Sequence, residues 1–272
     1  MLGKLIKHEF RATARLMLPL FLVVILLSCF MRLTSSILES GSHHSFALRL
    51  VSGLFTAGFV LSTIVALVFA VVLMVSRFYK NLMTDEGYLM FTLPVSIHQL
   101  IWSKLIVSTV WFLATILADM LGVLIASYQS GMLHDIMTGF GSFFRELAHF
   151  YGFNGAGFAL EALAILLLSL IVSCLNFYAP IAVGHSFSGH KILLSVVFYF
   201  VFSIAWQIVG LTGMFSGVEL LSTRAPLMLD TTEAVLRTAH YSMLAAIGAL
   251  AFVGAVMYVI TWLMLKKRLN LQ

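Results

Sequence analysis

Charged residues are scarce in this chain. Asp, Glu, Lys and Arg make up 10% of its 272 residues, whereas a typical soluble protein has about 25%. Hydrophobic residues make up 61%, and the mean hydropathy is +1.05. This composition excludes an ordinary soluble domain. The relevant measure is therefore the run of about 20 apolar residues that a membrane-crossing helix needs.

Cysteine is also rare. The only two cysteines, Cys29 and Cys174, both lie in apolar runs. They are 145 residues apart, which is not a metal-ligand spacing, and they imply no disulfide framework. We interpret both as small buried residues. No catalytic residue, cofactor or metal is expected in this chain.

A nucleotide-binding motif is missing as well. Residues Gly184–Lys191 imitate a phosphate-binding loop, but His190 occupies the position of the lysine and no hydrophobic strand precedes the motif. We interpret this segment as a tight cytoplasmic turn. The net charge of +5 does not indicate nucleic-acid binding, because the chain has no soluble basic domain that would bind a nucleic acid.

Long apolar runs are what the chain has instead. Six of them have the length of a membrane-crossing helix: Leu16–Met31, Leu48–Val75, Leu100–Tyr128, Phe158–Val183, Ile192–Met214 and Ser242–Leu265. The first run is short and is expected to borrow a turn from the basic residues before it. The sequence therefore predicts an all-α integral membrane protein with one transmembrane domain over residues 1–272.

Basic residues are distributed unevenly between the connecting segments. With the N-terminus inside and six alternating spans, eleven of the sixteen Lys and Arg residues lie in inside segments and five lie outside. The inside set is Lys4, Lys7, Arg11, Arg15, Arg77, Lys80, Lys104, Lys191, Lys266, Lys267 and Arg268. Cytoplasmic loops carry an excess of such residues. We therefore expect both termini to face the cytoplasm.

An amphipathic helix is predicted over residues 1–15. Its basic residues step by three, four and four, and so share one helix face: Lys4, Lys7, Arg11 and Arg15. Apolar residues occupy another face. Such a helix lies along the membrane surface with its cations toward anionic headgroups. A simple topology anchor is an alternative interpretation.

A polar bridge over residues 77–99 separates the second and third runs. Pro94 keeps the residue before it out of the helical conformation. Ser96 and Gln99 then fit a capping box at the start of the third span. The bridge is expected to contain a short helix around Lys80–Phe91, a rigid turn and a firm helix start. An ordinary capped loop is the alternative.

Asp119 is an acidic residue inside the third run. It follows Lys104 by fifteen residues, or about 22 Å along a helix, which places it in the outer third of a hydrocarbon core about 30 Å thick. A charge there is costly, so Asp119 is expected to face protein or water. It is either a polar spot on an exit path or a subunit interface, or a partly solvated or protonated residue near the outer boundary.

Two stretches resemble a known family. They are D-E-G-Y-L-M-F-T-L-P-V-S at residues 85–96, which leads into the Ser-Lys-Leu at residues 103–105, and L-G-K-L-I-K-H-E-F-R at residues 2–11. Both resemble the type-2 ABC exporter permeases, the membrane subunits of bacterial ABC exporters, so the resemblance implies a multi-pass protein of the bacterial inner (plasma) membrane. The resemblance implies an N-terminal elbow helix, six spans and a cytoplasmic coupling helix between spans two and three. It also implies export of an apolar or amphipathic substrate, driven by a separate ATPase subunit that binds ATP and Mg.

The resemblance assigns the contact with the ATPase subunit to the bridge. The residues expected to make this contact are Asp85, Glu86, Gly87, Tyr88 and Leu89. A second permease protomer, identical or related, is expected to complete the transporter. Two other classes stay open. An ion-coupled secondary transporter would carry several membrane-embedded charges or repeats, and an intramembrane enzyme would need a pair of polar groups where Asp119 stands alone.

Overall fold

The structure is a computed structural model that describes residues 2–40, 46–84, 87, 90, 92, 94–129, 132–151, 155–187, 189–224 and 232–267. Within these ranges the chain forms seven long helices and no strand. They are α1 (Leu2–Glu39), α2 (Phe46–Met83), α4 (Ile97–Ala126), α5 (Met132–Tyr151), α6 (Gly155–Gly184), α7 (Lys191–Arg224) and α8 (Thr232–Lys267). The predicted all-α class is confirmed.

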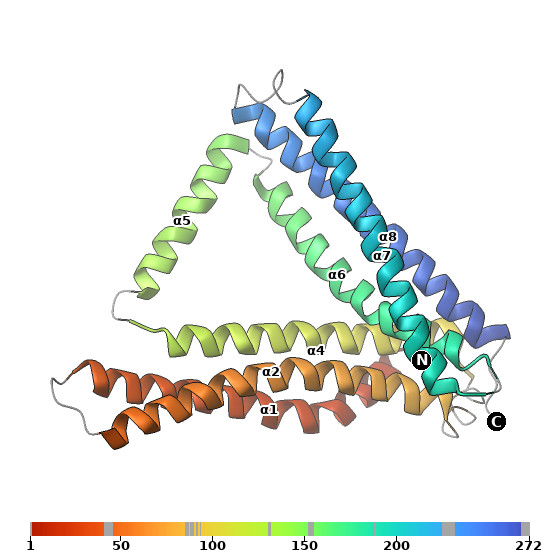
Figure 1. The fold of residues 1–272 in the computed structure, drawn as a ribbon, viewed down its shortest axis with the longest axis horizontal. Coiled ribbons are helices and arrows are strands. Elements are labelled where there is room, and N and C mark those ends of the chain that lie inside the picture. Colours follow the sequence, from red (N-terminus) through yellow and green to blue (C-terminus); the bar gives the residue numbers. More distant parts are fainter. Residues whose placement is uncertain are drawn as a thin grey trace. The chain divides into compact units, whose positions relative to one another are not determined.

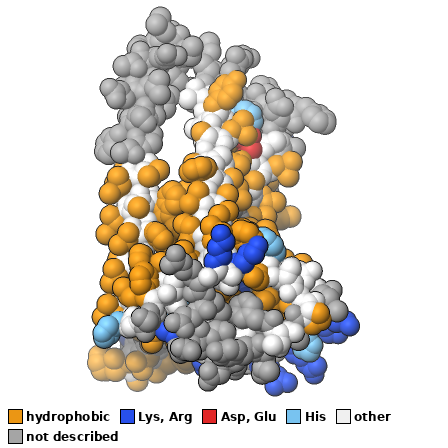
Figure 2. Space-filling model, turned by 90° about the vertical axis from the view of Figure 1, so that its right-hand side faces the viewer, with side chains coloured by type: hydrophobic (Ala, Val, Ile, Leu, Met, Phe, Trp, Pro, Cys, Tyr) orange, Lys and Arg blue, Asp and Glu red, His pale blue; other side chains and the backbone are white. Residues whose placement is uncertain are grey.

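Six of the described helices are long and apolar enough to cross a membrane: α1, α2, α4, α6, α7 and α8. Each covers most of one predicted run, so the number and order of the candidate spans are confirmed. Large apolar side chains such as Leu54, Leu160 and Phe252 are exposed, and Figure 2 shows hydrophobic side chains over most of the described surface in that view. Soluble proteins rarely expose apolar surface on this scale, whereas lipid hydrocarbon accommodates it.

The N-terminal segment is not a separate helix, which corrects one prediction. Residues 2–15 are the first part of α1, which continues to Glu39 without a break. The predicted cationic face is present, because Lys4, Lys7, Arg11 and Arg15 are all exposed. The opposite face carries Glu9 and Thr13, which are buried against other helices. The segment is therefore continuous with the first candidate span, and its inner face packs on protein. Its position at the membrane surface stays a prediction.

The chain divides into two compact units. Unit 1 comprises Met1–Arg77 and Gln99–Thr138, and unit 2 comprises Phe78–His98 and Gly139–Gln272. The chain passes from unit 1 to unit 2 inside α2, and it returns to unit 1 inside α4. The polar bridge therefore belongs to unit 2, while most of the two helices that it joins belongs to unit 1.

In unit 1, helices α1, α2 and α4 lie side by side (Figure 1). One buried cluster contains Met17 of α1, Leu73 of α2 and Trp111 of α4. A second cluster contains Val24 and Phe59. The start of α1 thus meets the end of α2 and the start of α4, so α2 runs antiparallel to the other two helices.

In unit 2, α6 packs against both α7 and α8 (Figure 1). Phe177 of α6 stacks on Tyr199 of α7, with 4.9 Å between the ring centroids. At the end of α6, Gly184 lies so close to α7 that an added Cβ would stand 2.6 Å from the Cα of Ser195. This glycine is needed for the close approach of two helices, which explains part of the imitation of a phosphate-binding loop.

Each unit has an acid–base pair near the start of its first and third spanning helices. In unit 1, Glu9 of α1 pairs with Lys104 of α4. In unit 2, Glu161 of α6 pairs with His240 of α8, with 2.8 Å between Oε1 and Nδ1. Both acids are buried at 9% relative exposure. Each pair links two helices that run in the same direction.

Candidate functional site

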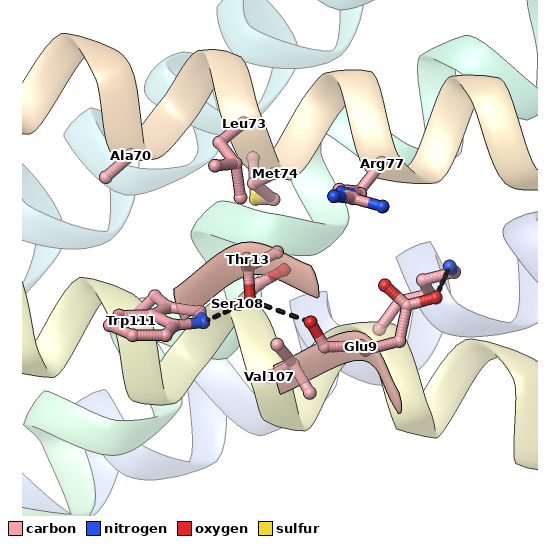
Figure 3. A pocket seen from close by; sticks show the side chains of 10 residues that line it. Glu9, Thr13, Ala70, Leu73, Met74, Arg77, Val107, Ser108 and Trp111 are labelled. Atoms are coloured by element: carbon pink, nitrogen blue, oxygen red, sulfur yellow. Dashed lines mark hydrogen bonds and ion pairs between the residues drawn. The ribbon is translucent and has the colours of Figure 1, made fainter. Parts of the chain in front are cut away.

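An enclosed polar group in unit 1 lies where α1, α2 and α4 meet. We call it the α1–α4 polar cluster, and it comprises Glu9, Thr13, Arg77, Lys104 and Trp111 (Figure 3). The Glu9 carboxylate accepts a hydrogen bond from the Lys104 ammonium group. Their side chains are 11% and 4% exposed, so water screens this pair little.

Hydrogen bonds extend the cluster along α1. The indole Nε1–H of Trp111 donates to Thr13 Oγ1 at 2.7 Å, and that hydroxyl donates to the backbone carbonyl of Glu9 at 2.8 Å. The guanidinium of Arg77 donates to the carbonyl of Ala12 at 3.3 Å. Because each described donor has a partner from another helix or another turn, the cluster fixes the register of α1 against α2 and α4.

The enclosed space in the cluster is small. Its residues surround a cavity of about 10 Å³, roughly the volume that one water molecule needs. A substrate does not fit such a space. The buried ion pair instead stabilises the packing of α1 against α4, because removal of either charge would leave the other buried without its partner.

The bridge is held to unit 2 by aromatic contacts at both ends. At its start, Phe78 stacks on Tyr178 of α6 with 4.0 Å between the ring centroids, and both side chains are fully buried. At its end, His98 stacks on Trp262 of α8 at 5.2 Å, and its Nδ1 lies 2.6 Å from the hydroxyl of Tyr258. The bridge is therefore fastened to α6 at one end and to α8 at the other.

The middle of the bridge differs in part from its prediction. Residues Lys80–Met83 complete α2, so they do not begin a separate helix. Gly87 is helical and buried, and its N–H donates to the carbonyl of Thr84 at 2.7 Å. The helix α4 begins directly after Ser96, as the predicted capping box requires. The other predicted ATPase contacts, namely Asp85, Glu86, Tyr88 and Leu89, lie outside the described residues.

Asp119 is buried at its polar end. Both carboxyl oxygens are shielded from solvent, and neither has a hydrogen-bond partner among the described residues. The side chain as a whole is half-buried on α4. A buried acid without a partner is uncommon in proteins, so Asp119 stays a candidate for a polar position on a pathway or at an interface. It lies apart from the α1–α4 polar cluster, because fifteen helical residues separate it from Lys104.

The α1–α4 polar cluster was not predicted from the sequence. Lys104 counted only as a basic residue of an inside segment, and Glu9 received no role. One signal was present, because Glu9 and Thr13 are polar residues four positions apart on the helix face opposite the cationic stripe. Such a polar pair beside apolar neighbours indicates a buried contact, but it does not identify the partner.

Comparison of the chain with protein-family models, with curated proteins and with solved structures gives no match. The class of the protein therefore follows from its own features. Six long apolar helices with exposed apolar faces define a multi-pass α-helical membrane protein. Six such helices suggest a membrane protein of the transport type.

Proposed function

We propose that this chain is the membrane subunit of an ATP-driven exporter and that it works with a separate ATPase subunit. The observation that supports this proposal best is the placement of the bridge. Its ends contact α6 and α8 in unit 2, while the helices on either side of it pack with α1 in unit 1. A force applied to the bridge would reach helices of both units.

The motif resemblance supports the same function. Residues 85–96 resemble the coupling segment of type-2 ABC exporter permeases, in which a soluble ATPase drives the membrane subunit. In the mechanism that we propose, ATP binding closes two ATPase subunits, the bridges move with them, and the spans of two permease protomers tilt. A pathway for an apolar or amphipathic substrate then opens outward.

The first experiment tests the contact with the ATPase subunit. Exposed charge pairs contribute about 0–1 kcal/mol each, whereas an aromatic anchor often dominates an interface. Tyr88→Ala should therefore reduce co-purification with the ATPase subunit more than Glu86→Gln does. Unchanged association and transport after substitution of all five residues from Asp85 to Leu89 would contradict the proposal.

A second experiment separates coupling from binding. His98 is exposed and stacks on α8 through its ring, so His98→Ala should leave the chain folded and the ATPase bound. The loss of the stack should reduce substrate-stimulated ATP hydrolysis in the assembled complex. Thr92→Ala is a matched control, because Thr92 is also an exposed bridge residue. Equal effects of the two variants would show that the His98 stack has no special role.

An ion-coupled secondary transporter is the second candidate function. Asp119 favours it, because a membrane-embedded acid without a described partner suits the binding of a coupling ion. Transport by proteoliposomes that contain only this chain, compared with proteoliposomes that also contain the ATPase subunit, distinguishes the two functions. Uptake driven by an ion gradient without ATPase would support the second candidate, and strict dependence on ATPase and ATP would support the first.

A further inference from the structure

An open groove lies in unit 2 where α6 turns into α7. Its volume is about 790 Å³, within the roughly 300–1,000 Å³ range of small-molecule sites. Its lining combines polar residues at the start of α7 with apolar residues further along that helix. This groove includes the end of the segment that imitates a phosphate-binding loop, and neither of the functions proposed above uses it.

The polar end is basic. Lys191 is the first residue of α7, and both Lys191 and the exposed His190 line the groove. No acidic residue is among the described residues that line it. The backbone N–H groups of the first turn of α7 add partial positive charge at the same end. An anionic group is therefore the complementary ligand.

The apolar end continues along α7. Leu193, Val196 and Val197 line the groove and are 61%, 50% and 46% exposed. They lie within about 9 Å of Lys191 along the helix. This part of α7 belongs to a candidate membrane span, Lys191–Leu211. The groove therefore places a cationic end beside an apolar wall at the boundary of a span.

His185 forms a neutral part of the lining. It is 4% exposed, its Nδ1 lies 2.9 Å from the carbonyl oxygen of Ile181, and Tyr79 packs edge-on against its ring. Burial lowers the pKa of His185, and the charge of Lys191 lowers it further, against the opposing effect of the Ile181 carbonyl. The cationic character of the groove thus comes from Lys191 and not from His185.

We propose that this groove binds an anionic phospholipid. The phosphate lies at Lys191 and His190, and an acyl chain lies along Leu193, Val196 and Val197. A free phosphate ion would use only the basic end, whereas a lipid uses both ends. Basic pockets beside membrane helices are known to bind acidic lipid headgroups. The inference rests on the membrane-spanning character of the chain and is independent of the proposed exporter function.

Native mass spectrometry of the full chain, purified in detergent, tests this inference. Phosphatidylglycerol and phosphatidylcholine are titrated separately, and retained lipid is measured for each. Phosphatidylglycerol should bind more tightly. Lys191→Ala should weaken its binding about fivefold, the effect expected for one cation near a membrane surface. Lys191→Arg should restore it, and His190→Gly, which suits the left-handed φ of 49° at this position, should weaken binding without disturbing the turn.

Three further measurements test whether the groove itself recognises the lipid. Lys267→Ala removes the same charge from an exposed residue in the last turn of α8 that does not line the groove, so it should leave binding unchanged. Leu193→Ser should weaken phosphatidylglycerol binding through the apolar wall. Inorganic phosphate at equal concentration should not displace the lipid.

Several results would overturn the proposal. Equal losses for Lys191→Ala and Lys267→Ala would indicate general attraction to positive charge. Displacement of the lipid by inorganic phosphate would identify a site for a free anion. Equal binding of the two lipids, or no effect of His190→Gly and Leu193→Ser in folded protein, would show that the groove does not recognise an anionic lipid.

Discussion

Removal of one partner from the buried Glu9–Lys104 pair should destabilise the protein strongly. Lys104→Met keeps most of the volume of the side chain but leaves the Glu9 carboxylate in a site where it is only 11% exposed. The loss of one partner of a buried ion pair typically costs about 3–5 kcal/mol. In a protein of this size such a loss lowers the melting temperature by roughly 10 °C.

Removal of both charges together should cost less stability than removal of one. The double variant Glu9→Gln with Lys104→Met leaves no buried charge unpaired, so it should recover at least half of the stability that Lys104→Met alone loses. Replacement of both partners of a buried pair is often nearly neutral. The non-additivity of the two substitutions measures the coupling between the side chains.

Thermal unfolding in detergent, followed by intrinsic tryptophan fluorescence, measures these effects. Trp111 is a suitable reporter because it hydrogen-bonds within the same cluster. Lys7→Met is the matched control, since Lys7 is an exposed lysine on the opposite face of α1, and its change should stay within about 0.5 kcal/mol. Two results would refute a stabilising role of the Glu9–Lys104 pair. One is a Lys104→Met variant as stable as Lys7→Met, and the other is a double variant whose loss of stability equals the sum of the losses in the two single variants.

Three further predictions follow from the structure and the expected topology. Gly184→Ala should disrupt the α6–α7 turn and lower folded yield, because the new Cβ would overlap the α7 backbone; normal yield and melting temperature would contradict this packing. Asp119→Leu should leave the isolated chain equally or more stable, since it removes buried oxygens without a described partner, but it should reduce transport in the assembled protein; unchanged transport would remove the functional role. In a variant without Cys29 and Cys174, Asp85→Cys should resist an impermeant thiol reagent added outside intact cells, and labelling from outside would reverse the predicted orientation.

Local properties of the sequence determined the spans and the start of α4. Hydropathy is summed along the chain, so each apolar run predicts its own helix without knowledge of its neighbours. The start of α4 directly after Ser96 is equally local, since a capping residue acts on the next turn only. The exposure of the basic stripe on α1 follows from its spacing for the same reason.

Tertiary packing decided which residues contact the inner face of the N-terminal segment. Its sequence pattern is that of a surface helix, with cations on one face and apolar residues on another. The pattern does not reveal that Glu9 and Thr13 on the inner face find partners on α4, 95 and 98 residues away along the chain. Residues 2–15 belong to the long helix α1, and these contacts hold the inner face of that segment against α4.

Only the tertiary structure decided which helices group together and where the bridge is fastened. The polar bridge is visible in the sequence as a break between two apolar runs, but its attachment to Tyr178 and Trp262 depends on how α6 and α8 pack. Apolar surfaces are alike in their attraction to lipid and to each other, so hydropathy alone does not select the partner of a helix. The selection comes from side-chain shape, ring stacking and paired buried charges, which exist only when the helices are assembled.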